Sequence, residues 1–392
     1  MFEDRYFGRG ALYDVIIIGL GVMGSATAWQ AARAGLSVLG LDQFETGHHR
    51  ASSHGQTRVI RRVYGEGDIY MPLLGRAYAL WDEIAGAAGE DFLIRTGGLD
   101  IGPTDSSLLQ TALATARTWR IDHEYLTAPD ICARWPAFRL PDHYAAVFAP
   151  QSGLLRSDAA NAWLRSAAAD AGAALRWTTL VSRWRREGDS YVVTTSAGEE
   201  RARKLVSAAG AWTGMLVPEL DAGLTVERQV VAWFEPRTDL STLPVFQVDP
   251  EDGMRPYVMP PLDGAGLKIG VYGHLGERGS VMRQGRGPDA ADEALLRANV
   301  ERWLPGTIGK TELMMECRFT RTRDDRFIIG PLPDDPGVIM LSPCSGHGYK
   351  FAPAVGEAAT DLVLERHPRI DLGPFAVERA CRSRSRIASR PG

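Results

Sequence analysis

The chain has 392 residues, of which 45% are hydrophobic and 23% are charged, and its formal net charge at pH 7 is −4. This length allows two domains with substantial cores, and the composition is typical of a globular enzyme. The arginines are scattered rather than gathered in a stripe, so the sequence does not predict a nucleic-acid-binding protein. Four widely separated cysteines without a C-x-x-C pair argue against a zinc site and against a disulfide scaffold.

The sequence predicts neither a signal peptide nor a membrane-spanning helix. Its first apolar run, residues 15–20, is too short for either and is taken up by the first predicted strand. We therefore expect a cytoplasmic protein with no membrane partner. The basic, serine-rich stretch over residues 379–390 is expected to be a solvated terminus.

Residues 13–42 are the most informative segment of the sequence. A strand buried on both faces is predicted at residues 15–18, where four β-branched residues follow one another. Three glycines in G-x-G-x-x-G spacing come next, followed by an alanine-rich segment, residues 25–34, that predicts a helix. A second apolar run, residues 36–41, predicts another strand. This order of strand, turn, helix and strand is typical of a dinucleotide-binding fold.

The residues of this motif have separate physical roles. Gly19 allows a tight turn, Gly21 lets the backbone approach a pyrophosphate, and Gly24 lets the helix pack closely on the strand. The helix N-terminus offers N–H groups to phosphates. Asp42 lies 42 − 19 = 23 residues after Gly19 and can accept hydrogen bonds from ribose hydroxyls. The motif alone does not distinguish FAD from NAD.

A loop with three histidines, His48, His49 and His54, follows at residues 43–56. No carboxylate or cysteine stands at ligand spacing, so the loop is interpreted as a phosphate-lining or surface loop rather than a metal site.

Thr57 opens a segment that carries three arginines, Arg58, Arg61 and Arg62. Guanidinium groups beside a nucleotide fold can pair with carboxylates or phosphates. Ordinary surface charge explains them equally well, and these residues alone do not decide.

The middle of the chain predicts an alternation of helices and strands. Its helices are expected at residues 71–87, 106–119, 128–135 and 158–171. Its strands are expected at residues 97–102, 153–156, 175–181 and 190–195, the last two joined through a charged turn at 183–189.

Residues 204–212 run from an apolar strand into small residues that end with Gly210 and Trp212. A plain structural turn explains this pattern, but beside the first motif it is typical of the far wall of a dinucleotide crevice.

Three alternating strand patterns at residues 226–234, 257–260 and 267–272 are separated by proline and glycine turns. They predict an antiparallel sheet and hence a second domain. Tyr257 and Lys268 lie in these strands, where a tyrosine usually half-packs the core and a lysine usually points to water.

The last third of the chain predicts a second glycine-rich turn between a strand and a helix. The strand is expected at residues 338–341 and the helix at 354–364, with Gly346, Gly348 and Lys350 between them. As in the first motif, backbone N–H groups at such a turn can bind an anion or the edge of a cofactor ring. Lys350 can place a positive charge against a reduced cofactor.

The fold class predicted from these patterns is α/β, or α+β overall. A Rossmann-type nucleotide-binding domain is expected from residues 1–95, 151–225 and 320–392. A smaller substrate domain on an antiparallel sheet is expected from residues 96–150 and 226–319. The nucleotide signals flank the antiparallel patterns, so the two domains are expected to be interleaved.

Taken together, these segments resemble the FAD-dependent amine oxidases typified by monomeric sarcosine oxidase, which have a D-amino-acid-oxidase-like fold. The resemblance runs from Tyr13 to about Phe375. It rests on YDVIIIGLGVMG, SSHGQTRVIRRVYGEGDIYMPL, ARWPAFRLPD, SGLLRSD, SAAGAW, GLKIG, the isolated Cys317 and SGHGYKF. The combination is highly specific for the family and much less specific for the substrate.

The resemblance implies a role for each position that matches a family motif. Cys317 corresponds to the cysteine that carries FAD through a thioether to the flavin 8-methyl carbon. Arg61 and Lys350 match the pair that holds the substrate carboxylate, and Arg58 matches an arginine close to the flavin ring. Lys268 matches the lysine that promotes oxygen reduction.

Other positions concern the substrate cavity. Tyr257 matches an active-site tyrosine, whereas the family histidine expected after the Leu-Lys-Ile-Gly-x run is replaced by Tyr272. His274, two residues on, lies on the same face if the strand continues, and it either substitutes for that histidine or is a loop residue. Phe319 replaces the tyrosine that the family places two residues after the flavin-linked cysteine.

The implied function is oxidation of a secondary amine α to a carboxylate, such as sarcosine or N-methyl-tryptophan. The imine product hydrolyses, and O₂ is reduced to H₂O₂. The expected partners are an amino-acid substrate, O₂ and FAD, without a metal, in a monomer or small homo-oligomer. The alternatives are an oxidase of a cyclic imino acid or fructosyl amino acid, a flavin dehydrogenase, an NAD-linked enzyme, and a non-catalytic flavin-binding partner.

Overall fold

The computed structural model describes residues 11–221, 223–279 and 285–381. Most of the basic stretch expected to be a solvated terminus, residues 382–390, lies outside the described residues. Among the described helices, none is both long enough and apolar enough to cross a lipid bilayer.

The chain folds into two compact units, each assembled from separate segments. The first unit consists of Met1–His54, Ala159–Thr225 and Thr320–Gly392, and the second consists of Gly55–Asp158 and Val226–Phe319.

The bounds of these units differ from the domain division drawn from the sequence. Residues 55–95 and 151–158 belong to the second unit, although the sequence placed them in the nucleotide-binding domain. These segments carry β3 (Thr57–Ile60), β4 (Leu93–Ile94) and β8 (Gly153–Arg156), which form a three-stranded sheet. Leu154 of this sheet packs with Val245 and Met259, so the sheet joins the core of the second unit.

The first unit is built on an eight-stranded sheet whose path runs β10-β11-β12-β1-β2-β9, with β20 paired to β12 and β19 paired to β20. β1 pairs in parallel with β2 and β12, and β12 pairs in parallel with β20. The strands are β1 (Leu12–Ile18), β2 (Val38–Leu41), β9 (Ala174–Arg176), β10 (Val181–Glu187), β11 (Ser190–Thr195), β12 (Gly198–Ser207), β19 (Ile328–Leu332) and β20 (Asp335–Ser342).

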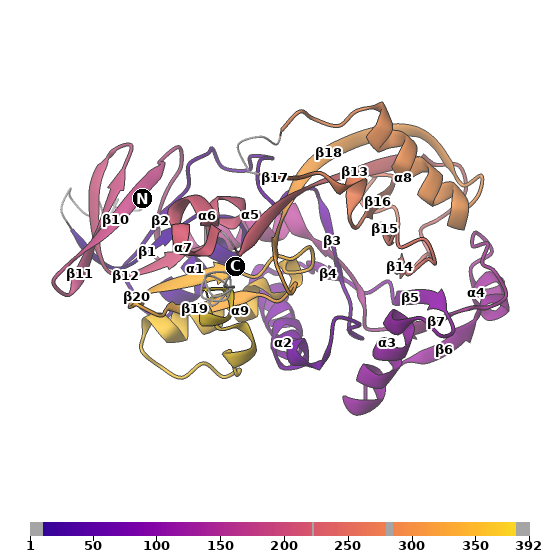
Figure 1. Ribbon diagram of the computed structural model, residues 1–392, viewed down its shortest axis with the longest axis horizontal. Helices are drawn as coiled ribbons and strands as arrows, with labels where there is room; N and C mark the ends of the chain where they lie inside the picture. The colour runs from indigo at the N-terminus through magenta and orange to yellow at the C-terminus, as the bar shows by residue number, and fades with distance from the viewer. Residues whose placement is uncertain (1–10, 222, 280–284, 382–392) are drawn as a thin grey trace, which may run out of the picture. The chain divides into compact units, whose positions relative to one another are not determined.

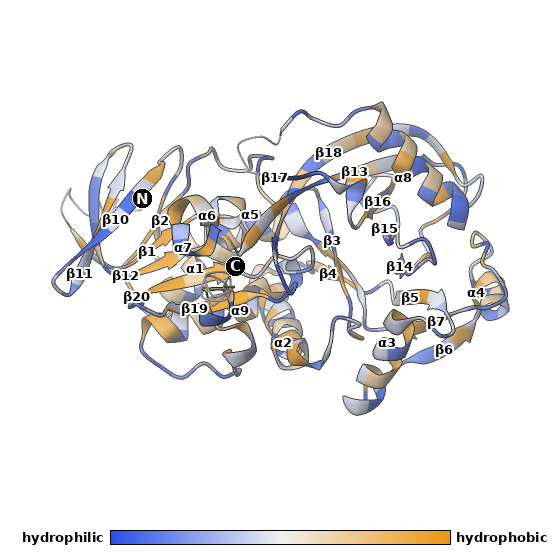
Figure 2. Ribbon diagram, in the orientation of Figure 1, coloured by the Kyte–Doolittle hydropathy of each residue, from blue (hydrophilic) through white to orange (hydrophobic). Residues whose placement is uncertain are grey.

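Two helices of the first unit, α1 (Val22–Arg33) and α9 (Ala352–Val363), pack against each other (Figure 1). Gly356 allows this close approach, because a Cβ atom there would lie 2.7 Å from the backbone carbon of Ala26. Figure 2 shows β1 and β20 coloured as predominantly hydrophobic, in agreement with their buried positions in the sheet. The shorter helices assigned to this unit are α6 (Thr213–Leu216), α7 (Pro218–Asp221) and α10 (Glu378–Cys381), and α5 (Ser157–Asp170) begins at the boundary.

The second unit contains a nine-stranded sheet with the path β17-β13-β16-β15-β14-β5-β7-β6 and with β18 paired to β13. Most of the neighbours are antiparallel, as the alternating patterns predict, whereas β14 and β5 are parallel. The strands are β5 (Gly98–Pro103), β6 (Glu124–Thr127), β7 (Tyr144–Ala149), β13 (Leu224–Pro236), β14 (Val245–Val248), β15 (Pro256–Met259), β16 (Leu267–Val271), β17 (Arg278–Gly279) and β18 (Ile308–Thr322).

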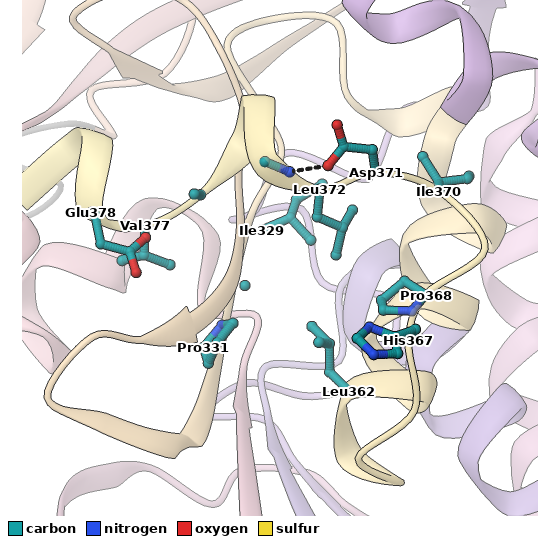
Figure 3. Close-up of a pocket in the computed structure, with 13 residues that line it drawn as sticks. Ile329, Pro331, Leu362, His367, Pro368, Ile370, Asp371, Leu372, Val377 and Glu378 are labelled. Atoms are coloured by element: carbon teal, nitrogen blue, oxygen red, sulfur yellow. Dashed lines mark hydrogen bonds between the residues drawn. The ribbon is translucent and has the colours of Figure 1, made fainter.

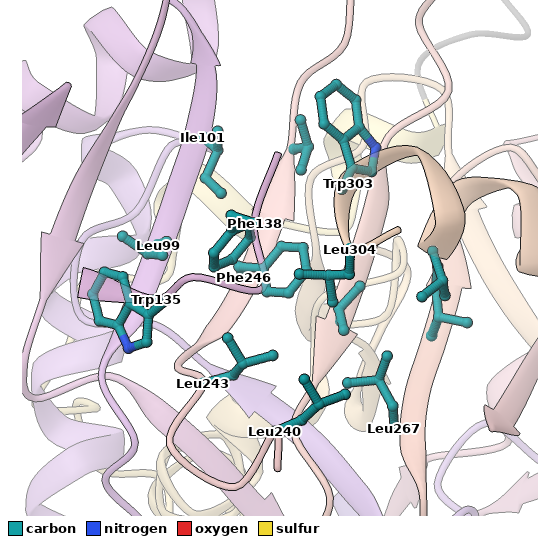
Figure 4. Close-up of a cluster of buried hydrophobic side chains, with 14 of the residues drawn as sticks. Leu99, Ile101, Trp135, Phe138, Leu240, Leu243, Phe246, Leu267, Trp303 and Leu304 are labelled. Carbon is teal, nitrogen blue, oxygen red and sulfur yellow. The ribbon is translucent and has the colours of Figure 1, made fainter. Parts of the chain in front are cut away.

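A large hydrophobic core packs on this sheet and includes Leu99, Phe138, Phe246, Leu267 and Trp303 (Figure 4). Burial of these apolar side chains is the main term that stabilises the unit. The helices of the unit are α2 (Met71–Ala88), α3 (Ser107–Thr118), α4 (Ala128–Arg134) and α8 (Ala290–Trp303).

Several sequence predictions of local structure are wrong. The strand expected at residues 175–181 is broken, because β9 ends at Arg176 and β10 begins only at Val181. The charged turn expected at residues 183–189 is largely strand, because β10 extends to Glu187. The side chains of β10 are mostly exposed, and its charged residues form ion pairs with β12, as Arg185 Nη1 does with Glu199 Oε1 at 2.7 Å. A charged strand of this kind resembles a turn in the sequence. The strand expected to end at Tyr272 ends at Val271.

Candidate functional site

The first glycine-rich turn lies between β1 and α1. Gly19 has φ +95°, and a Cβ atom there would lie 2.6 Å from the Ala208 carbonyl oxygen. A Cβ atom at Gly24 would lie 1.8 Å from the Gly19 carbonyl oxygen. A loop serine also contributes, since the Val22 N–H donates to Ser53 Oγ at 3.0 Å. The turn therefore requires glycine at both positions and brings the strand end, the helix N-terminus and the loop together.

Asp42 follows β2 directly, as the motif predicts. Its carboxylate accepts hydrogen bonds from the Leu20 N–H at 2.8 Å and the Phe44 N–H at 3.0 Å, and His48 Nε2 lies 3.6 Å away. Burial alone would raise the pKa of Asp42, but His48 and these two N–H groups lower it, so the side chain is a carboxylate at neutral pH. An ionised acceptor at this strand end is what a ribose hydroxyl requires.

The second glycine-rich turn also lies in the first unit. Gly346 has φ +82°, and a Cβ atom at Gly348 would lie 1.5 Å from the Pro343 carbonyl oxygen. Lys350 follows in a short 3₁₀ helix, where its side chain is buried and its Nζ donates to the His347 carbonyl oxygen at 2.6 Å. The turn thus holds a buried cation beside a strand-to-helix junction.

Gly210 and Trp212 lie in a 3₁₀ turn after β12. Gly210 has φ +54°, a backbone conformation that favours glycine. The Trp212 ring packs edge-to-face on Phe44 with the ring centroids 5.3 Å apart. This part of the first unit therefore has a wall of aromatic residues beside the loop that follows Asp42.

These features fit a dinucleotide such as FAD. In each of the two turns a glycine stands where a Cβ atom would meet a carbonyl oxygen, and each turn precedes helical N–H groups, the arrangement that binds phosphate. Gly19, Gly21, Gly24 and Asp42 would hold the phosphates and ribose.

The second unit brings Lys268 and Arg58 together on one turn of the backbone. Lys268 Nζ donates to the Gly55 carbonyl oxygen at 2.5 Å and to the Thr57 carbonyl oxygen at 2.8 Å. Arg58 Nη1 donates to the same two oxygens, at 3.5 Å and 2.9 Å. Lys268 faces Trp233 across the β13–β16 pair, with Nζ 4.6 Å from the ring centroid.

Lys268 does not point to water, although that is usual for a lysine on a strand. Its side chain is 1% exposed, and burial together with the Arg58 charge holds the pKa of Lys268 well below its usual value. A buried amine with a depressed pKa and specific partners is a mark of a functional site.

An aromatic group lies in the same unit. The rings of Tyr257 and Tyr272 have centroids 5.1 Å apart, and those of Tyr272 and Phe319 are 6.1 Å apart. Burial raises the pKa of Tyr257 well above its usual value, and the nearby Cys317 and Tyr272 raise it further, so the phenol stays neutral. Cys317 also acts electrostatically on Lys268. The structure therefore gathers the predicted residues Arg58, Tyr257, Lys268, Tyr272 and Cys317.

Arg61 is buried between two carboxylates. Its Nη1 donates to Asp100 Oδ1 at 2.9 Å and its Nη2 donates to Glu66 Oε1 at 2.5 Å. Gln247 Nε2 also donates to Asp100 Oδ1, at 2.7 Å. Although burial alone lowers the pKa of Arg61, Glu66 and Asp100 raise it well above its usual value, so this cation is permanent.

Of the two alternatives that the sequence leaves open for His274, the structure favours the loop residue, because His274 lies in a 3₁₀ turn after the end of β16. Its side chain is fully buried, and Nε2 lies 2.7 Å from Asp292 Oδ1. Asp292 is also paired with Arg228, whose Nη2 donates to Oδ2 at 2.7 Å. This arrangement favours a structural role for His274.

Comparison with known proteins agrees with this geometry. The model of the FAD-dependent oxidoreductase family matches residues 14–362. The chain belongs to this family. As a member of this family it is an FAD-dependent oxidoreductase.

Within the FAD-dependent oxidoreductases, the chain is 38% identical over 374 residues to an N-methyl-L-tryptophan oxidase from Salmonella heidelberg (strain SL476), covering 94% of this chain and 99% of that protein. Among solved structures, NikD, an unusual amino acid oxidase, matches with a TM-score of 0.83 at 24% identity, over 93% of this chain and 97% of that one. Glycine oxidase from Geobacillus kaustophilus matches with a TM-score of 0.78 at 21% identity, over 93% and 98% of the two chains. At these identities the structural matches show the fold alone.

A pocket of about 330 Å³ in the first unit is separate from the predicted site residues (Figure 3). Its walls are mostly apolar, and Asp371, whose Oδ1 accepts from the Gly373 N–H at 2.8 Å, lies on its rim. None of the residues predicted for FAD or substrate lines it, within the part of the chain that the structure describes.

The structure adds residues that sequence reasoning missed. Trp233 lies opposite Lys268 only because of the strand register, and Asp100 meets Arg61 from a different strand. Asp158 accepts from the N–H groups of Gly55 and Gln56. A signal for Asp158 was available, since it ends the SGLLRSD segment of the family resemblance.

Proposed function

We propose that this FAD-dependent oxidoreductase is an oxidase of an N-methyl amino acid, acting on a secondary amine α to a carboxylate. The observation that carries the proposal is the buried Lys268, held beside Arg58 in the same unit as Cys317 and Tyr257. The relative that is named an N-methyl-L-tryptophan oxidase supports the substrate class. In the overall reaction the amine loses two electrons and two protons to give an imine, and O₂ gains both to give H₂O₂.

The chain's own residues would bind and orient the reactants. When bound, FAD supplies the acceptor for the electrons of the amine and returns them to O₂. We propose that Cys317 links the flavin through its sulfur to the 8-methyl carbon. Arg58 provides positive charge, which makes the flavin ring a better electron acceptor.

Substrate recognition is proposed for Arg61 and Lys350, because a buried carboxylate needs cationic partners that donate hydrogen bonds. Arg61 keeps N–H groups beyond the two that bind Glu66 and Asp100, since a guanidinium has five. Tyr257, Tyr272 and Phe319 would form an apolar wall for the rest of the substrate. No protein acid or base is required, since the substrate reacts as the neutral amine.

We propose that Lys268 assists the reduction of O₂. Negative charge develops on O₂ as electrons arrive, and a fixed cation in a buried site stabilises this charge far more than a surface lysine does. The two carbonyl oxygens that accept from Nζ hold the group in place.

The proposal is tested by incubating the purified yellow protein with N-methyl-L-tryptophan and with sarcosine, and by measuring O₂ uptake, H₂O₂ and formaldehyde. L-tryptophan is the matched control, because it lacks the N-methyl group. Equal yields of H₂O₂ and formaldehyde from an N-methyl substrate are expected. Reduction of an added dye without O₂ uptake would instead identify a dehydrogenase, and the absence of any reduction by N-methyl amino acids would contradict the substrate class.

A further inference from the structure

The turn that receives Lys268 is itself held by an acid that no step above uses. Asp158, in the first turn of α5, accepts from the Gly55 N–H through Oδ1 at 3.1 Å and from the Gln56 N–H through Oδ2 at 2.7 Å. The two oxygens of one carboxylate therefore accept hydrogen bonds from consecutive N–H groups of the same turn.

This turn has a backbone shape that needs such support. Gly55 has φ +104° and Gln56 has φ +63°, and the second value is uncommon for a residue with a side chain. The Gln56 carbonyl oxygen accepts from the Ser157 N–H at 2.7 Å. Residues 157 and 158 thus hold the turn at three hydrogen bonds in a conformation that the chain would otherwise rarely adopt.

The shape of the turn sets where its carbonyl groups point. The Gly55 and Thr57 oxygens converge on Lys268 Nζ, at 2.5 Å and 2.8 Å, on the buried side of the turn. Asp158 is on its exposed side. A Cβ atom at Gly55 would lie 3.4 Å from Arg58 Nη1 and 3.6 Å from Lys268 Nζ, so the turn lies directly against both cations.

We propose that Asp158 is a positioning residue for Lys268, acting through the Gly55–Thr57 turn in the oxygen-reducing half of the reaction. The inference rests on the proposed function, because it takes Lys268 as the cation that assists O₂ reduction. Asp158 fixes the turn, the turn fixes the two carbonyl oxygens, and the oxygens fix the amine. Its negative charge acts on Lys268 in the same direction as the carbonyl oxygens, since both favour the protonated form.

A purely structural role is the alternative. An acidic side chain in the first turn of a helix stabilises the helix through its dipole, independently of any contact with the Gly55–Thr57 turn. That role predicts lower thermal stability but no selective effect on the reaction with O₂.

The test compares Asp158→Asn with Asp263→Asn in the holoenzyme. Asp263 is a matched control, because its carboxylate lies in the same unit but pairs with Arg156, at 2.8 Å and 2.9 Å, rather than with the turn. Stopped-flow absorbance measures flavin reduction by N-methyl-L-tryptophan without oxygen, and then reoxidation on mixing with O₂. We expect Asp158→Asn to slow reoxidation about tenfold and to change reduction less than about twofold. Asp263→Asn should change neither.

A second readout does not depend on turnover. The chain has only four lysines, Lys204, Lys268, Lys310 and Lys350, so carbon-13 labelling of lysine gives four side-chain signals in an NMR spectrum. The Lys268 signal is assigned by its loss in Lys268→Met, and its titration is followed in the resting holoenzyme. We expect Asp158→Asn to lower the pKa of Lys268, because the charge and the ordered carbonyl oxygens that stabilise the ammonium are lost.

Asp158→Glu keeps the charge and the acceptor oxygens, so it should restore reoxidation to within about threefold of the unmodified protein and restore the Lys268 titration. An Asp158→Asn protein with normal reoxidation and a normal Lys268 titration would overturn the inference. So would equal slowing of both half-reactions with an unchanged titration, which is the mark of a structural role. If the unmodified protein is not reduced by an N-methyl amino acid, the proposed function fails instead.

Discussion

Arg58 and Lys268 donate hydrogen bonds to the same pair of carbonyl oxygens, those of Gly55 and Thr57. Two cationic groups are thereby held side by side in a buried part of the second unit. Burial and the repulsion by Arg58 favour loss of the Lys268 proton. The hydrogen bonds to the two carbonyl oxygens favour the protonated form. The pair is poised so that the arrival of negative charge nearby would stabilise both cations.

Substitution of Lys268 by methionine should separate the two halves of the reaction. The change keeps an unbranched side chain, one atom shorter, but removes its charge, so we expect reoxidation by O₂ to slow about 100-fold. Anaerobic flavin reduction by substrate should change far less. Stopped-flow absorbance measures both rates, and normal reoxidation in this variant would contradict the role of Lys268.

The rate of reoxidation should depend on the ionisation of Lys268. Burial and Arg58 lower the pKa of Lys268 well below its usual value, so the ammonium is present at low pH and is lost as the pH rises through this depressed value. We expect reoxidation to be fast at low pH and to fall as the pH rises. Lys268→Met should abolish this limb of the profile, and a profile that is the same in both proteins would assign the limb to another group.

Arg61→Ala should raise KM for the amino acid by about 100-fold, because charge-assisted hydrogen bonds to the substrate carboxylate are lost. It also leaves Asp100 and Glu66 without their shared cation, which should lower the free energy of unfolding by about 3–5 kcal/mol. Steady-state kinetics and denaturant unfolding measure the two effects. Arg61→Lys keeps a positive charge and serves as a control that is expected to fold. If KM is unchanged in both Arg61→Lys and Arg61→Ala, Arg61 does not bind the substrate.

Gly24→Ala should prevent FAD binding or folding of the first unit. A Cβ atom at residue 24 would lie 1.8 Å from the Gly19 carbonyl oxygen, so the phosphate-binding turn cannot keep its shape. Gly86→Ala in α2 is the control, because nothing lies within 4 Å of the added carbon there. The ratio of flavin to protein absorbance after purification measures the outcome, and equal ratios in the two variants would count against this turn as the FAD site.

Cys317→Ser should leave FAD bound but releasable. The unmodified protein, precipitated with acid, should give a yellow pellet whose denatured gel band fluoresces, because a thioether survives unfolding. Cys317→Ser should give a white pellet and a yellow supernatant. A white pellet from the unmodified protein would contradict the covalent link through Cys317, but it would not contradict the binding of flavin.

The sequence predicts the nucleotide-binding turn and its strands well, because the residues of the glycine motif are close together in the chain. Gly19, Gly24 and Asp42 lie where the motif predicts, since a turn depends on adjacent residues. The roles of Lys268 and Cys317 came from family resemblance, because nothing local in a strand pattern distinguishes a buried lysine from an exposed one.

Other features depend on strand pairing between distant segments, which the sequence does not reveal. Trp233 lies under Lys268 through the β13–β16 register, and Asp158 reaches a turn about 100 residues earlier in the chain. The charged strand β10 resembles a turn in the sequence, because its ion pairs form with β12 and cannot be recognised from local residues. The sequence leaves the position of His274 open, because it does not reveal that β16 ends at Val271.

The proposed oxidation of an N-methyl amino acid is tested by an anaerobic titration of the purified protein with N-methyl-L-tryptophan, followed by admission of air, with the visible absorbance recorded throughout. We expect the yellow absorbance to bleach as substrate is added and to return in air with one H₂O₂ formed per flavin. A colourless protein, or a yellow protein that no N-methyl amino acid bleaches, would contradict it.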